Sequence, residues 1–316
     1  MADYQIAVRQ TDDIEMGSTS ISESIPVVPK MEIKKQTIPA ALSTCIDGSP
    51  CIKAESIYVD SPVPIPDDTP ESSNLDLIRK LCAETLGSAI LVTIIVGSGI
   101  MAERLSPNDV GLQLLENGIS VCCGLIGLII MFGPVSGAHF NPCVSFVDYL
   151  DGDMSAVDCI LYTICQVTGA IIGAILADIQ FDEKISISSK DRDDSNLWLG
   201  EVIATITLLL VIHGCVRTGQ KSYVPFAVGT WVLAGHFFTS STIFANPAVT
   251  IGRQFSNTFA GINPDSVGPY IGFQFLSCFI AYGLIQFFYP HNLSMKKDDN
   301  LYLRVCVQNA KRHGDC

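Results

Sequence analysis

Two Asn-Pro motifs, Asn141-Pro142-Cys143 and Asn246-Pro247-Ala248, carry the side chains best suited to a chemical task in this chain. Asn is a favoured N-cap and Pro a favoured first helical residue, so each motif predicts the sharp start of a helix. A helix N-terminus carries roughly +0.5 charge, and an Asn amide can donate hydrogen bonds to a passing oxygen. Two such ends facing each other would repel cations and protons while binding neutral oxygens. This is the chemistry of a pore.

A third Asn-Pro pair, Asn263-Pro264, differs from these two. It is followed by Asp265 and Ser266 rather than by an apolar run, and Asn-Pro often marks a turn. We therefore predict a turn there. The other two motifs each follow a long apolar segment and open a short apolar stretch, at 141–150 and 246–259. Both stretches are too short to cross a bilayer, so we predict re-entrant half-helices that are buried in protein or line water.

Long apolar segments surround the two motifs and must position them. Apolar residues make up 48% of the 316 residues and charged residues only 16%, whereas a soluble chain would have about 25% charged residues. Six segments approach the roughly 20 residues that a membrane-spanning helix needs. They are 79–102, 112–133, 156–180, 197–216, 223–239 and 268–289, of which the fifth has the least certain limits. The chain is therefore predicted to be an all-α, multi-pass membrane protein.

Basic residues predict the orientation of these spans. Arg79 and Lys80 precede the first span, Arg217 and Lys221 lie between the fourth and fifth, and several Lys and Arg follow the sixth. The positive-inside rule then places both termini in the cytoplasm, at the plasma membrane or an intracellular membrane. Residues 1–75 are polar, acidic and rich in Ser and Pro, and they predict a disordered cytoplasmic tail. Residues 291–316 predict a second cytoplasmic tail. Much of the net charge of −13 lies in the N-terminal tail, and this acidic tail argues against nucleic acid as a partner.

The channel segment 76–290 repeats itself in outline, with repeat one at 76–181 and repeat two at 196–290. Glu84 lies in the first span and Glu201 in the fourth, each ahead of one Asn-Pro motif. Three spans per half give the halves opposite topology, and inverted repeats with broken helices place a conduction site at the bilayer midplane. A carboxylate buried in a span needs partners. We expect both acids to accept hydrogen bonds from the re-entrant loops, with a proton relay as the alternative.

Backbone carbonyls of the residues before each Asn are expected to line the path. These are Gly137, Ala138 and His139 in the first half and Thr242 to Ala245, including Phe244, in the second. Carbonyls accept hydrogen bonds, so together with the two Asn amides they would replace the hydration shell of a neutral solute. They would not replace the hydration shell of an ion between two positive helix ends.

From about residue 77 to 290 the chain resembles the aquaporins, the major intrinsic protein family of water and glycerol channels. The resemblance rests on Ala83-Glu84 with Gly87, Ser136-Gly137-Ala138-His139-Phe140-Asn141-Pro142, Gln166 with Gly169 and Gly173, Glu201 with its apolar run, and Phe244-Ala245-Asn246-Pro247-Ala248-Val249. It implies an aquaporin-like right-handed bundle of six transmembrane helices plus two re-entrant half-helices. It also implies a homotetramer in the lipid bilayer, with one pore per subunit for water and small neutral solutes.

The family carries a four-residue selectivity filter near the outer mouth, which maps here onto Val121, His236, Ile243 and Val249. Most members have Arg where this chain has Val249, and water-selective members have Phe where it has Val121. The resemblance therefore implies a wide, apolar filter that passes glycerol, urea or metalloid acids such as arsenous acid. The second half is also similar to bacterial aquaporins found beside arsenic-resistance genes, which lack the same Arg.

Two further residues near the motifs have open interpretations. Arg253 follows Val249 by four residues, so it shares that helix face one turn further out. It either guards the outer vestibule or extends its charge to the membrane interface. Cys143 stands where the family has Ala. Its small side chain should preserve the half-helix, and the sequence leaves open whether the thiol faces the pore.

Three function classes fit such a chain. A passive channel for water and small uncharged solutes is favoured by the paired Asn. A coupled transporter would need ion ligands or titratable groups at the midplane. A structural or poorly conducting membrane protein is the third. The sequence contains no metal-ligand cluster and no nucleophile–base set, so we expect neither enzyme activity nor a cofactor or metal.

Overall fold

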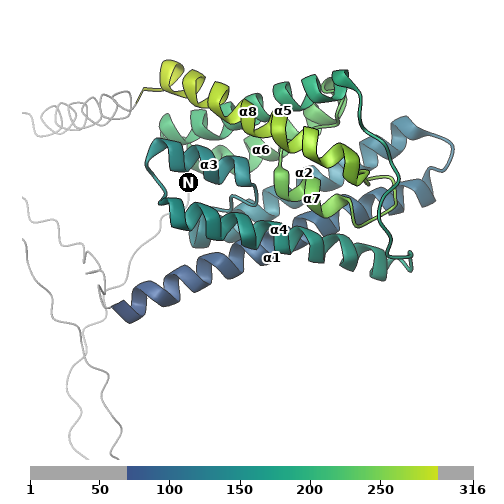
Figure 1. Cartoon of the computed structure of the whole chain (residues 1–316), viewed down its shortest axis with the longest axis horizontal. Helices are drawn as coiled ribbons and strands as arrows, with labels where there is room; N and C mark the ends of the chain where they lie inside the picture. The colour runs from purple at the N-terminus through teal and green to yellow at the C-terminus, as the bar shows by residue number, and fades with distance from the viewer. Residues whose placement is uncertain (1–69, 291–316) are drawn as a thin grey trace, which may run out of the picture. The chain divides into compact units, whose positions relative to one another are not determined.

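The computed structural model describes residues 70–290, which form eight α-helices and one short 3-10 helix without a β-strand in that range (Figure 1). In chain order the elements are α1 Pro70–Leu105, α2 Val110–Ser136, α3 Pro142–Asp151, α4 Ala156–Gln180, α5 Ser195–Arg217, η1 Lys221–Tyr223, α6 Val224–Phe238, α7 Pro247–Arg253 and α8 Pro264–Phe288. Helix α1 begins inside the segment 1–75 that we predicted as a tail. The rest of that segment and the predicted tail 291–316 lie outside the described residues.

Each predicted span corresponds to one helix, and five of the six helices are long. Within residues 70–290, five helices are long and apolar enough to cross a membrane: α1, α2, α4, α5 and α8. The sixth, α6, has 15 residues and follows the 3-10 turn η1, which agrees with the uncertain limits of the fifth predicted span. Pro225 occupies the first turn of α6, where its missing N–H costs nothing.

The helices pair in the same way in both halves. Helix α1 lies along α4 and α5 lies along α8, while α2 contacts α6 across the two halves (Figure 1). The half-helices connect the halves, because α3 contacts α8 as well as its neighbour α4, and α7 contacts α4 as well as α8. Each short helix is therefore held by a long helix from the other half, which places both inside the bundle.

Close approach of α1 and α4 depends on two glycines of α4. A Cβ on Gly173 would lie 2.1 Å from the Ala89 carbonyl oxygen, and one on Gly169 would lie 2.2 Å from that of Thr85. Small residues of this kind allow helix backbones to touch in a membrane. Neither contact can relax by moving a flexible side chain, since backbone atoms are involved.

We expect Gly173→Ala to destabilise the fold, because the added methyl group forces α1 and α4 apart. Overpacking of this kind typically costs about 1–3 kcal/mol. Thermal unfolding of the detergent-solubilised protein should show a lower Tm. Gly127→Ala is the matched control, since a Cβ there meets nothing within 4 Å, and Ala favours helix over Gly by about 1 kcal/mol. An unchanged Tm for Gly173→Ala would contradict the tight contact.

Two boundaries differ from the sequence prediction. The predicted turn at Asn263-Pro264 is wrong: Asn263 caps α8 by accepting a hydrogen bond from the Asp265 N–H at 3.0 Å, and Pro264 is the first residue of that helix. The polar residues after Pro264 concealed a helix start, because Asp in a first turn is itself favourable. The second half-helix ends at Arg253 rather than near residue 259. A loop then returns the chain to α8.

Candidate pore between the two half-helices

Both Asn-Pro motifs begin short helices that their Asn side chains cap. Asn141 has an extended backbone, and its Oδ1 accepts from the Cys143 N–H at 2.9 Å. Asn246 is also extended, and its Oδ1 accepts from the N–H groups of Ala248 at 3.0 Å and Val249 at 3.3 Å. Pro142 and Pro247 are the first residues of α3 and α7. Each cap satisfies backbone donors that a helix start would otherwise leave unpaired.

The two Asn amides also form a reciprocal pair of hydrogen bonds between the halves. The Asn141 Nδ2 donates to the Ala245 carbonyl at 2.8 Å, and the Asn246 Nδ2 donates to the Phe140 carbonyl at 2.8 Å. Each amide has two N–H groups, and one of them is used in this way. The second N–H of each Asn is the group that could serve a solute.

Left-handed backbone conformations precede each Asn. Ala138, Phe140, Thr242, Ile243 and Ala245 all have φ between 45° and 60° although none is Gly. Such residues are uncommon and tend to occur at functional sites, where the surroundings impose them. In these unwound segments the backbone carbonyls are not used in the hydrogen bonds that they would make inside a helix.

Glu84 holds the first unwound loop. Its carboxylate is fully buried and accepts from the N–H groups of His139 at 3.1 Å and Phe140 at 2.8 Å. The Ser136 hydroxyl and the Gln166 amide donate to it as well, at 2.6 and 2.8 Å. Four donors compensate a carboxylate that burial would otherwise penalise.

Glu201 has the equivalent place in the second half. It is fully buried and accepts from the N–H groups of Phe244 at 3.0 Å and Ala245 at 2.8 Å, and from the Gln274 amide at 2.5 Å. Both acids are therefore attached to the loops as the repeat suggested. These partners are backbone N–H groups, side-chain amides and the Ser136 hydroxyl, and none of these is a titratable group that links the two acids.

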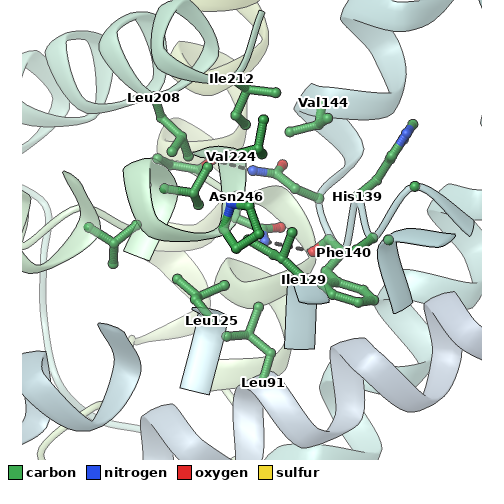
Figure 2. A pocket seen from close by; sticks show the side chains of 18 of the residues that line it. Leu91, Leu125, Ile129, His139, Phe140, Val144, Leu208, Ile212, Val224 and Asn246 are labelled. Atoms are coloured by element: carbon green, nitrogen blue, oxygen red, sulfur yellow. Dashed lines mark hydrogen bonds between the residues drawn. The ribbon is translucent and has the colours of Figure 1, made fainter. Parts of the chain in front are cut away.

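A cavity of about 1100 Å³ passes by both Asn side chains. Figure 2 shows Asn246 beside the Phe140 carbonyl, with Leu208 and Ile212 on one side and Leu91 and Leu125 on the opposite side. Apolar side chains from α1, α2, α5 and α6 form the walls, and polar groups gather at the two ends. We name these the Arg253 end and the Arg217 end after one residue of each.

All four predicted filter residues line this cavity, which also reaches Gly137, Ala138, His139 and Phe244. Val121, Ile243 and Val249 are buried apolar side chains. The His236 Nδ1 lies 2.7 Å from the Val232 carbonyl, so it carries the proton and leaves Nε2 as an acceptor. The four predicted filter residues therefore comprise one polar side chain, His236, and three apolar side chains.

Comparison with known proteins shows which family the chain belongs to. Residues 71–272 match the Major intrinsic protein family. The chain belongs to the major intrinsic protein family. It is 42% identical over 212 residues to the aquaglyceroporin AqpS of Rhizobium meliloti (strain 1021), covering 67% of this chain and 90% of that protein. It is 32% identical to an aquaglyceroporin of Toxoplasma gondii (strain ATCC 50611 / Me49), covering 52% and 66%.

Among solved structures, the aquaglyceroporin of Plasmodium falciparum is 19% identical, with a TM-score of 0.49, covering 66% of this chain and 97% of that one. Membership in the major intrinsic protein family supports a channel for water and small solutes. Together with the apolar helices it supports an integral multi-pass membrane protein. Members of this family are channels, which fits a protein that is not an enzyme.

Arg253 lines the cavity as well, one helical turn beyond Val249 in α7. The residue is only 7% exposed, so it does not extend to the membrane interface. Its guanidinium lies 3.5 Å from the centre of the Phe244 ring, and its Nε donates to the Ala260 carbonyl. A cation over an aromatic face is stabilised by the ring quadrupole. Arg253 is therefore fixed at this end of the cavity.

The loop between α4 and α5 brings more positive charge near Arg253. Arg192 lies 5.0 Å from the centre of the same Phe244 ring, and the Lys190 Nζ donates to the Phe259 carbonyl at 2.6 Å. Burial, followed by the charges of Arg192 and Arg253, lowers the pKa of Lys190 to about 8. A pKa of about 8 leaves most of the Lys190 ammonium charged at neutral pH, so Lys190 adds positive charge to that of Arg192 and Arg253.

Sequence reasoning missed several polar residues at the Arg217 end. Asp148, Asp151 and Asp153 follow the first motif, and His213 and Arg217 lie late in α5; all line the cavity. From the sequence, His213 late in the fourth predicted span is interpreted as an ordinary buried or interfacial histidine. The sequence contained a clue to Asp148, because it is the seventh residue of a half-helix that is otherwise largely apolar. The Phe140 carbonyl, which accepts from the Asn246 amide, was not predicted either, whereas the Ala245 carbonyl was among those expected to line the path.

Cys143 points away from the cavity. It is fully buried in a cluster with Val147, Leu209 and Cys278, and it is absent from the cavity lining. The Cys278 thiol lies 3.9 Å from the Cys143 carbonyl. The question that the sequence left open is thus answered by packing.

We expect that mercurial reagents do not inhibit solute flux by reacting with Cys143. A thiol without access to the cavity reacts slowly, and its mercury adduct would not lie in the path. Cys143→Ala should show the same response to mercury as the parent chain in a liposome swelling assay. Val249→Cys places a thiol on the cavity wall and should create strong inhibition. Relief of mercury inhibition by Cys143→Ala would contradict this placement.

Proposed function

We propose that this protein is a passive channel for water and small uncharged solutes, including glycerol, urea and metalloid acids. Val249 carries the proposal: it is an apolar side chain on the cavity wall, at the position where the family resemblance expects a narrowing Arg. Val121 and Ile243 add no polar group, so a solute with carbon atoms meets little resistance there. The names of the two aquaglyceroporin relatives support the same solute class.

Ion exclusion in this proposal comes from the opposed N-termini of α3 and α7. The reciprocal bonds of Asn141 and Asn246 support it, because they bring the two positive helix ends together. An ion there would lose its water shell without receiving compensation. We further propose a homotetramer with both termini in the cytoplasm, which places the Arg217 end on the cytoplasmic side.

A coupled transporter is less well supported. Transport coupled to an ion requires ligands or titratable groups free to change state at the midplane. Glu84 and Glu201 already accept bonds from their own loops. A structural or poorly conducting membrane protein remains the alternative that flux measurements address directly.

Purified protein in liposomes tests the proposal. Vesicles are mixed rapidly with hyperosmotic sucrose and then with hyperosmotic glycerol, and their shrinkage and re-swelling are followed by light scattering. We expect faster water exit and faster glycerol entry than in empty vesicles. Water exit at the rate of empty vesicles would remove the channel, and fast water exit without glycerol entry would remove the wide filter alone.

Arg253 guards the outer mouth in this proposal. Replacing it with Ala removes the fixed charge of the Arg253 end, and we expect cation leak to rise while glycerol flux changes little. Removing one buried, fixed charge is worth roughly 1–2 kcal/mol, or about tenfold in cation permeability. The measurement is sodium-driven collapse of a vesicle potential. Arg104→Ala is the control, because that Arg contacts Phe181 and Glu183 away from the cavity. Unchanged cation leak in Arg253→Ala would contradict the guard.

A further inference from the structure

The Arg217 end of the cavity holds a carboxylate between two imidazoles that the proposed filter does not use. Asp148 in α3 lines the cavity, and its side chain is 24% exposed. Its Oδ2 lies 3.2 Å from the His139 Nε2, and its Oδ1 lies 3.8 Å from the His213 Nδ1. Residues from the first loop, α3 and α5 therefore converge on one acidic group beside the path.

His213 has an unused nitrogen. Its side chain is 5% exposed, and its Nε2 is buried without a hydrogen-bond partner in the part of the chain that the structure describes. Buried polar atoms are nearly always paired, so such an atom calls for a water or a ligand. The Nδ1 lies 3.8 Å from the Asp148 carboxylate, which favours the tautomer with the proton on Nδ1 and an acceptor at Nε2. Asp148 and His213 thus offer acceptors to hydroxyl donors.

Two other charged groups at this end, Arg217 and Asp151, are engaged with each other. Arg217 donates to both oxygens of Asp151, to the Gln286 side chain at 3.2 Å and to the Tyr289 carbonyl at 2.6 Å. Gln286 completes the set by donating to Asp151 at 2.7 Å. This network holds Arg217 beside Asp151, while Asp148 remains with its two imidazoles. Val144 and Ile212 form apolar wall next to them.

We propose that Asp148 and His213 form a second solute-recognition site, at the Arg217 end, for neutral molecules with two or more hydroxyl groups. The proposal rests on the proposed channel function and names the solute class for its inner end. One hydroxyl of a polyol donates to Asp148 and another to His213, while the carbon skeleton lies along the apolar wall. Bonds to a charged acceptor are stronger than neutral ones, so a polyol is favoured over a molecule with fewer donors. His139 positions the carboxylate from its other side.

The test compares glycerol and water permeability of the full chain in liposomes. Asp148→Asn keeps the shape but removes the charged acceptor, and His213→Leu removes the ring nitrogen. We expect each to lower the glycerol-to-water permeability ratio about fivefold, which is roughly the effect of one lost hydrogen bond. His213→Gln restores an acceptor and should keep the parent ratio. Asp153→Asn is the charge-matched control, because Asp153 lines the same end outside the pair of imidazoles.

Several outcomes would overturn the proposal. One is a glycerol-to-water permeability ratio in Asp148→Asn that equals that of the parent chain. Another is a decrease in this ratio in Asp153→Asn as large as in Asp148→Asn, which would indicate a general effect of charge. Loss in His213→Gln as large as in His213→Leu would indicate a packing role alone. Every variant is first checked for a single peak in size-exclusion chromatography and for parent-like water flux. A parent chain that conducts neither water nor glycerol would instead remove the proposed function, before any variant is compared.

Discussion

Replacing Val249 with Arg should lower glycerol permeability at least about tenfold while reducing water permeability much less. Val249 is a buried residue on the cavity wall, one helical turn from Arg253. A longer side chain there narrows the path, and its charge replaces apolar surface that glycerol carbons would contact. A tenfold decrease in glycerol permeability corresponds to about 1.4 kcal/mol of additional barrier. The steric and desolvation penalty of a single Arg side chain can supply a barrier of this size.

Val249→Leu is the matched control, since it adds volume without charge. It should reduce glycerol flux less than Val249→Arg does. The measurement is re-swelling of liposomes in glycerol, scaled to water exit from the same preparation. Equal loss of glycerol and water flux in Val249→Arg would argue against Val249 as a filter residue, because it would indicate a blocked or misfolded pore.

Replacing Glu201 with Leu should prevent formation of a stable folded channel. Three donors lose their acceptor at once: the N–H groups of Phe244 and Ala245 and the amide of Gln274. Each buried unsatisfied donor costs about 1–3 kcal/mol, so the sum is comparable to the 5–15 kcal/mol that typically separates folded from unfolded protein. We expect a loss of monodisperse protein in detergent and of water flux in liposomes.

Glu201→Gln should be intermediate, because one side-chain oxygen can still accept from the loop. Glu103→Leu is the control, since the exposed Glu103 accepts a single bond from the Phe259 N–H. A proton relay through Glu201 would appear differently: Glu201→Gln would fold normally and conduct water while changing proton flux. A Glu201→Leu protein as stable as the parent would contradict the supporting role.

Much of this architecture could be predicted because membrane spans and repeats leave strong signals. Length and apolarity located the five long helices and, with uncertain limits, α6, and the matching Asn-Pro motifs located α3 and α7. Boundaries set by side chains were harder. Asn263 caps α8 ahead of polar residues, so the apolar run 268–289 predicted the helix but did not mark its first residues. Helix α7 ends at Arg253, which is buried over Phe244 instead of facing solvent.

The parts of the candidate site that follow from the repeat could be predicted from the sequence. The parts that depend on packing between distant helices could not. Glu84 and Glu201 could be placed beside their loops from symmetry alone. Asp148 lies seven residues after Asn141, and the matching position after Asn246 is Arg253, so the repeat does not predict a carboxylate there. Its approach to His213 of α5 depends on tertiary packing that the sequence does not show. The orientation of Cys143 was likewise undetermined until its neighbours in α5 and α8 were known.

The reciprocal bonds between Asn141 and Ala245, and between Asn246 and Phe140, join residues that are 104 and 106 positions apart in the chain. Neither half-helix finds its partner until both halves have been synthesised and inserted. Contacts between such distant residues close late, after local helices have formed. The two half-helix ends therefore meet only in a chain whose second half has already been made, so a chain that stops before α7 lacks this junction altogether.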